Sequence, residues 1–261
     1  MMHDATSLPD DAPNSGGAAR HHVQARVLVL LDASRHSLAA LSVAVDLACR
    51  RHAELVALFV EDHDLLRSTD FPFACEVGMA SGMARPLSLS MLETHLIRQR
   101  ENVRQALSEM VAGREVRHSL KVSRGRVVTE ALALATRSDV LVLGKAGVSA
   151  QWGGRLGSTS RALVLQAPCT VLLWNETRPM ERGPLLAIGE SSAPAGNDWL
   201  VDNPLFDTVE RLPEVGVSAL ERRLAMSPCG ALLLSRTQLA HLVDEDPELL
   251  ARLPLPLVVV P

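Results

Sequence analysis

The chain has 261 residues and a mass of 28.1 kDa, which is enough for one full domain and a smaller second unit. Hydrophobic residues make up 47% of it and aromatic residues only 3%, with no tyrosine, so we expect an aliphatic core without base-stacking rings. The formal net charge of -4 argues against a polyphosphate partner, and no apolar run reaches the length of a membrane span. We expect a soluble cytoplasmic protein that binds neither nucleic acid nor membrane.

Cysteine and histidine spacing gives no sign of a metal site. The four cysteines, Cys49, Cys75, Cys169 and Cys229, lie far apart and form no Cys-x-x-Cys pair, so we interpret them as buried or idle thiols. The run from Glu61 to Asp64 is the one patch with residue types that bind metals. We interpret it as the solvated end of a strand.

Continuous apolar runs alternate with helical spacing from residue 25 onward, after a polar segment at 1–24 that is rich in Pro, Gly, Asp and Ser and is predicted to be disordered. The predicted elements of the first unit are, in chain order, strand Val27–Leu31, helix Leu38–Arg51 capped by Ser37, strand Ala53–Asp62, an irregular excursion at Asp64–Pro86, helix Leu89–Ala112, strand His118–Val122, helix Val127–Ala135, strand Val140–Leu143, helix Ser158–Gln166 and strand Cys169–Trp174.

This order of elements predicts an α/β fold, a doubly wound open parallel sheet of the Rossmann-like type. In such sheets, ligands bind outside the carboxyl ends of the strands where the direction of winding reverses. Asp32, at the end of the first strand, and the glycine-rich segment after Leu143 both fall at that edge.

The segment Leu143–Ser160, "LGKAGVSAQWGGRLGSTS", combines five glycines with four hydroxyl side chains. Glycines let backbone N–H groups approach a ligand and adopt positive φ, which is how anion nests form. The helix that begins at Ser158 adds unpaired N–H groups and its dipole, which favour a phosphate at that end. We therefore interpret this segment as a phosphate-binding loop.

The spacing of the glycines distinguishes between the known classes of nucleotide-binding loop. Gly144, Gly147 and Gly157-Ser158 follow the order G-x2-G-x9-G-[ST], counted from the end of the fourth strand. Lys145 has no upstream glycine of a Walker A loop, and Trp152 occupies the place where a first glycine would complete G-x-G-x-x-G. Neither of these other nucleotide signatures is present.

Together with this loop, "RVLVLLDASRHSLAALSVAVDLACRRHAELVALFVED" and "APCTVLLW" resemble the universal stress protein family, over residues 25–175. The resemblance implies a fold of the adenine nucleotide alpha-hydrolase-like type that binds ATP, with magnesium brought by the phosphates. It implies that Asp32 meets the adenine, that Val60 lines the base pocket, and that Leu143 and Gly144 flank the ribose and phosphates. The phosphate ligands that it implies are Gly147, Gly157, Ser158 and Thr159.

The sequence departs from the family pattern at two places. Two parts of the implied site could also have a purely structural role. Ala33 stands where the family more often has glycine, and Trp152 to Gly154 make the nine-residue segment bulky. Asp32 could serve only to cap the first helix, and Gly157-Ser158 could be an ordinary helix start.

The second half repeats part of the pattern. After a linker at 176–183, residues 184–261 are predicted to form strands at Pro184–Ser191, Gly230–Ser235 and Leu257–Val260, a partly helical stretch before Met226 and a helix at Gln238–Leu253. Ser235 stands where Gly144 would recur, so we expect a truncated α/β unit without a nucleotide site. A strand "LPLVVV" paired with "CTVLLW" would make a pseudo-dimer within the chain, the alternative to a homodimer.

Three functions remain open from the sequence. The first is a regulatory protein in which bound ATP changes the interaction with an unknown protein partner. The second is an ATP-hydrolysing enzyme, for which Asp32 and Asp62 are the candidate bases and Lys145 and Arg155 could stabilise charge. Against it, the sequence identifies no residue that activates water. The third is a scaffold that binds no ligand, with Trp152 folded into the site.

Overall fold

The computed structural model describes residues 25–78, 81–145, 156–174, 183–189, 205–206, 208–227, 229–253 and 255–261. The predicted disordered tail at 1–24, the loop residues Gly147 and Trp152, and residues 176–182 of the predicted linker lie outside these ranges.

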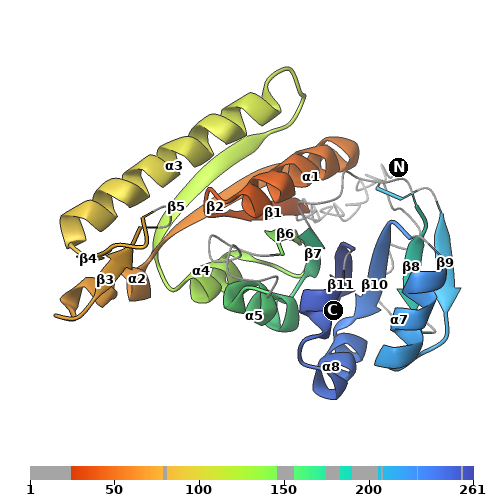
Figure 1. Cartoon of the computed structure of the whole chain (residues 1–261). Coiled ribbons are helices and arrows are strands. Elements are labelled where there is room, and N and C mark those ends of the chain that lie inside the picture. Colours follow the sequence, from red (N-terminus) through yellow and green to blue (C-terminus); the bar gives the residue numbers. More distant parts are fainter. Residues whose placement is uncertain are drawn as a thin grey trace, which may run out of the picture.

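A nine-stranded sheet forms the centre of the described chain, and a two-stranded sheet lies beside it (Figure 1). The strands of the large sheet are β1 (Arg26–Leu31), β2 (Glu54–Asp62), β5 (His118–Gly125), β6 (Val140–Gly144), β7 (Thr170–Trp174), β8 (Leu185–Ile188), β9 (Val209–Leu212), β10 (Ala231–Ser235) and β11 (Leu257–Val260), and those of the small sheet are β3 (Cys75–Val77) and β4 (Ala84–Pro86). The order β5-β2-β1-β6-β7-β11-β10-β8-β9 places β1 between β2 and β6, where the winding reverses. The doubly wound α/β fold is confirmed, with further α/β strands after residue 175.

Helices cover both faces of the large sheet. They are α1 (Arg35–Arg51), α2 (His63–Arg67), α3 (Leu89–Val111), α4 (Val127–Leu134), α5 (Ser158–Gln166), α7 (Val217–Met226), α8 (Arg236–Glu245) and α9 (Leu249–Arg252), with a 3-10 turn η1 at Ser68–Asp70. Buried side chains of α1 and α3 belong to one apolar cluster, and those of α4, α5 and α7 to α9 belong to another. Because successive residues of the inner strands alternate between the two clusters, the middle of the sheet is buried on both sides, whereas the edge strands β5 and β9 are largely exposed. None of the described helices is long and apolar enough to cross a membrane.

The first helix begins earlier than its sequence pattern predicts. α1 starts at Arg35, and its N-cap is Ser34, whose side chain accepts a hydrogen bond from the backbone N–H of Ser37. Ser37 therefore lies inside the helix, and the prediction that it caps the helix is wrong. Ala33 adopts φ of 60° just before the cap, a left-handed conformation that glycine adopts more easily, which explains why the family favours glycine there.

Two other predictions of local structure need correction. The stretch predicted as an irregular excursion contains α2, η1 and the antiparallel pair β3–β4. The predicted single helix over Gln238–Leu253 is divided into α8 and α9 around Pro247, because proline cannot donate the backbone hydrogen bond that a continuous helix needs.

A buried ion pair fixes the amino ends of β1 and β6. The guanidinium of Arg26 contacts the Asp139 carboxylate with an Nη2 to Oδ2 distance of 2.8 Å, and the backbone N–H of Thr136 donates to the same oxygen. Burial raises the pKa of Asp139, but these hydrogen bonds outweigh it and hold the pKa below its ordinary value. Charge in the core is thus fully partnered at this end of the sheet.

The two halves join edge to edge. β11 pairs with β7 in antiparallel register, with Leu257 opposite Leu173 and Val259 opposite Val171, so this edge of the first five strands is covered from within the chain. Arg236, the first residue of α8, donates hydrogen bonds to the carbonyl oxygens of Val164 and Cys169 across the same junction. The expected pairing of "LPLVVV" with "CTVLLW" is present.

Candidate functional site

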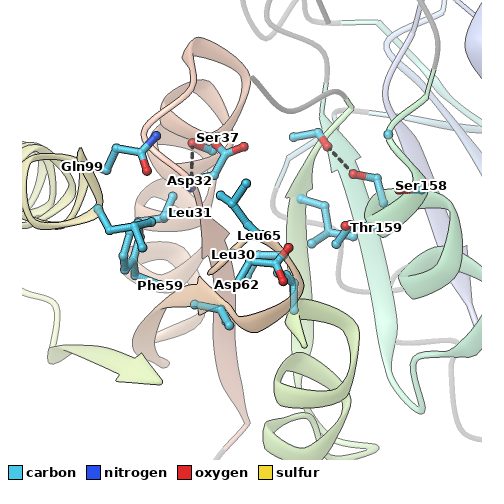
Figure 2. Close-up of a pocket in the computed structure, with 17 residues that line it drawn as sticks. Leu30, Leu31, Asp32, Ser37, Phe59, Asp62, Leu65, Gln99, Ser158 and Thr159 are labelled. Carbon is cyan, nitrogen blue, oxygen red and sulfur yellow. Dashed lines mark hydrogen bonds between the residues drawn. The ribbon is translucent and has the colours of Figure 1, made fainter. Parts of the chain in front are cut away.

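A pocket of about 470 Å³ opens at the carboxyl edge of the sheet, where β1 and β6 meet at the reversal of winding (Figure 2). Seven of the eight residues predicted to bind nucleotide line it, namely Asp32, Val60, Leu143, Gly144, Gly157, Ser158 and Thr159. The eighth, Gly147, lies outside the described residues. The volume falls within the range of small-molecule sites.

The carboxylate of Asp32 is fixed by its own turn. Its Oδ1 accepts the backbone N–H of Ser34 at 2.9 Å, while the Asp32 N–H donates to the Ser37 hydroxyl at 3.3 Å. Ser34, not Asp32, is the cap of α1, so the alternative that Asp32 caps that helix is wrong. The turn leaves Asp32 lining the pocket beside Gln99, as the sticks in Figure 2 show.

The amino end of α5 forms the opposite wall of the pocket. Gly157 is its N-cap and, having no side chain, supplies no capping hydrogen bond to the first N–H groups of this helix. Ser158 and Thr159 follow in the first turn, and the Ser160 hydroxyl donates to the Gly144 carbonyl at 3.0 Å. An uncapped helix end with adjoining hydroxyls is a site that favours an anion.

Gly144 has a structural requirement of its own. A Cβ on this residue would lie 2.8 Å from the backbone carbonyl carbon and oxygen of His36, because the end of β6 passes close to the first turn of α1. The absence of a side chain therefore lets these two walls of the pocket come together.

Several pocket residues were not predicted from the sequence. Phe59, Leu65 and Leu96 add apolar surface and Gln99 adds a polar group, while Asp62, which the sequence offered as a candidate base, also lines the pocket. Leu96 and Gln99 come from α3, and their spacing of three places both on one helix face, but nothing in the sequence shows that α3 reaches this pocket. Asp62 caps α2, with Oδ1 accepting the backbone N–H of Asp64 at 2.9 Å.

The sequence suggested that Lys145 could stabilise charge in the loop, but its side chain does not take that position. Its side chain is buried, and Nζ donates a hydrogen bond to the carbonyl oxygen of Leu253, beyond the end of α9. Burial lowers the pKa of this amine to about 8. Lys145 does not line the pocket but joins the loop to the second half of the chain.

Metal-binding side chains do not gather in the part of the chain that the structure describes. No group of three or more His, Cys, Asp or Glu residues there is arranged to hold a metal ion. None of the four cysteines forms a disulfide, and Cys169 and Cys229 are buried while Cys75 is exposed. Asp32 and Asp62 are the carboxylates that line the pocket.

A doubly wound sheet with an open helix end at its switch point defines a class of α/β proteins that bind small ligands at this edge. The model of the universal stress protein family matches residues 25–174. The chain belongs to the universal stress protein family.

Solved structures extend the likeness to both halves. A universal stress protein from Archaeoglobus fulgidus DSM 4304 is 11% identical, with 90% of this chain and 95% of that chain covered and a TM-score of 0.57. A functionally unknown protein from Pseudomonas aeruginosa PAO1 is also 11% identical, covers 91% and 92%, and has a TM-score of 0.53. At these identities they show the fold alone. A search of curated proteins gave no match.

Proposed function

We propose that this protein is an ATP-binding regulatory protein, in which adenine nucleotide occupies the pocket between β1, β6 and α5 and changes the binding of a protein partner. The observation that carries the proposal is the convergence of Asp32, Gly144 and Gly157 to Thr159 around one cavity of about 470 Å³. Glycine spacing and family resemblance, which depend on the sequence alone, point to these same residues. Such convergence is not expected of an ordinary helix start.

Each residue has a chemical task in this proposal. The adenine lies against Val60 and the apolar wall, where the Asp32 carboxylate accepts a hydrogen bond from the base. Leu143 and Gly144 flank the ribose. The backbone N–H groups of α5 and the hydroxyls of Ser158 and Thr159 donate to the phosphates, and the Gly147 backbone completes the loop.

Magnesium enters with the phosphates in this proposal and neutralises part of their charge. The N–H groups at the start of α5 fit a polyphosphate, since the N-cap residue Gly157 offers them no side-chain acceptor. Asp32 and Asp62 supply the carboxylates of the pocket, and we assign neither of them as a magnesium ligand.

The side chains of the pocket favour binding of ATP without its rapid hydrolysis. Asp32 and Asp62 each have one oxygen engaged by a backbone N–H of their own turn, and neither is assigned to activate water. Hydrolysis with one of them as base, and a scaffold that has lost the ligand, are the two alternatives that the test below separates.

Isothermal titration of magnesium ATP into the full chain tests the proposal. We expect one site per chain, abolished by Gly157→Val, and a tenfold or greater loss in affinity for the double variant Ser158→Ala with Thr159→Ala. Thr237→Ala is the matched control, because Thr237 stands in the exposed first turn of α8 and its removal leaves affinity unchanged.

The alternatives give different results. No heat, together with no rise in melting temperature with ATP, ADP or AMP, establishes the scaffold, since a ligand that binds only the folded state must stabilise it. Phosphate release that disappears in Asp32→Ala or Asp62→Ala while binding persists establishes the enzyme.

A further inference from the structure

Exposed apolar side chains are concentrated in one short part of the chain. Of the ten large hydrophobic side chains that are exposed among the described residues, eight come from residues 65–97: Leu65, Phe71, Phe73, Val77, Met83, Leu89, Met91 and Ile97. Phe73 is 78% exposed and its ring stacks on that of Phe71, with centroids 5.6 Å apart. Such a concentration on a water-exposed surface indicates an interaction site.

One of these residues, Met91, lines a groove beside α3. Figure 1 shows α2, β3 and β4 gathered at the amino end of that helix. A groove of about 570 Å³ lies there, between β3 and the first turns of α3, and its lining residues are Glu76, Leu87, Ser90, Met91, Leu92, Thr94, His95 and Arg98. Leu92 is buried at its base, and Met91 is 45% exposed within it, so the groove offers an adaptable apolar floor.

The charges of the groove favour an acidic occupant. Its carboxylate, Glu76, lies 3.9 Å from the guanidinium of Arg85 across the β3–β4 pair. Arg98 is exposed, and in the described ranges no carboxylate lies within ion-pair distance of it. His95 is its neighbour in the lining, three residues earlier on the same helix face.

We propose that this groove docks an amphipathic segment of another protein, with apolar side chains on Met91 and a carboxylate opposite Arg98. Arg98 is the charged side chain of this lining without an ion-pair partner among the described residues, so charge complementarity favours a partner segment that carries carboxylates. The proposal concerns a different cavity from the nucleotide pocket and does not depend on ATP binding.

The experiment uses the full chain and two fluorescein-labelled helical peptides of equal length, one built from Leu and Glu at amphipathic spacing and one from Leu and Lys. Fluorescence anisotropy at low salt measures their affinities. We expect the acidic peptide to bind at least tenfold more tightly than the basic one. Arg98→Glu weakens the acidic peptide at least tenfold, and Met91→Ser weakens it severalfold.

Arg104→Glu is the matched control, because Arg104 is exposed on the same helix, outside the groove, and its reversal changes net charge equally. We expect this variant to bind the acidic peptide as the unaltered chain does. Equal weakening by Arg98→Glu and Arg104→Glu would overturn the proposal, since it would show only general charge attraction.

Two further results would assign the groove to another occupant and also overturn the proposal. One is a tenfold gain in peptide affinity on deletion of residues 1–24, which would make the chain's own segment the occupant. The other is a dimer in sedimentation that Met91→Ser dissociates, which would make a second copy the occupant. Because all three substituted side chains are exposed, we expect the melting temperatures of these substituted variants to stay unchanged.

Discussion

The two halves of the sheet end differently at their carboxyl edges. In the first half, residues 145–157 separate β6 from α5, which begins at Ser158 after the N-cap residue Gly157, and Gly157 supplies no side-chain cap. In the second, β10 runs directly into α8, whose cap Ser235 forms a capping box with Gln238. The same strand-to-helix connection thus leaves one helix end open and closes the other with its own side chains.

Protein groups also occupy the rest of the second edge. A Cβ on Gly189, which has φ of +85°, would overlap Nε2 of Gln238, so glycine is needed where that side chain packs. At α7, the backbone N–H of Val217 donates to the Glu245 carboxylate at 3.2 Å. A carboxylate of the chain therefore takes the place at a helix end that an external anion would otherwise take. Connection length and cap residue, rather than sheet topology, distinguish the two edges.

Gly144→Ala should give the largest effect, because it attacks the close approach that shapes the first edge. The new Cβ meets the His36 backbone at 2.8 Å, and backbone must move to relieve the clash. We expect a loss of roughly 2 kcal/mol in the free energy of unfolding, measured by urea denaturation, together with weakened ATP binding. Gly125→Ala is the control, since its Cβ would meet only the flexible side chain of Glu130. An equal loss of unfolding free energy in both variants would show that the close approach at Gly144 has no special effect on stability.

Ser235→Ala tests the second edge. It removes the side-chain acceptor for the Gln238 N–H and half of the capping box, which should cost about 1 kcal/mol. Opening this helix end should not create a second nucleotide site, because Gln238 and Glu245 still line the edge. Urea denaturation measures the cost, and titration with magnesium ATP counts the sites. A stoichiometry of two would contradict the comparison.

Lys145→Met tests the contact between the two halves through its pH dependence. The pKa of about 8 in the folded chain lies below the unfolded value near 10.5, so the unfolded state holds more protons between these values and stability rises with pH across that window. The unaltered chain should gain on the order of 1 kcal/mol relative to Lys145→Met between pH 7.5 and pH 9.5. Parallel stability curves for the two proteins would show that the amine is not buried.

Ala33→Gly should give the smallest change in stability. It tests whether the left-handed turn at the first edge is strained. Relief of the left-handed conformation at φ of 60° outweighs the extra backbone entropy of glycine. We expect thermal unfolding to show a gain of about 0.5 kcal/mol, with ATP affinity unchanged because the turn keeps its shape. A loss of stability would indicate that Ala33 is not strained.

The strands and the pocket edge were predictable because local patterns encode them. Val27–Leu31 is apolar on both faces, and Asp32 follows it directly, so strand and pocket edge come from adjacent residues. The start of α1 was missed because Ser34 and Ser37 are both good caps, and the choice depends on the Asp32 turn. The α3 wall of the pocket was missed because Leu96 and Gln99 approach it through tertiary packing. The short strands β3 and β4 carry too little pattern to predict.

The β7–β11 pair has a consequence for protein concentration. Partners that meet through separate chains come apart on dilution, and their pairing varies with expression level. Here the two paired strands belong to one polypeptide, so their ratio is fixed at one to one and the pairing is independent of concentration. A cell that makes little of this protein would still have every copy with that strand edge closed.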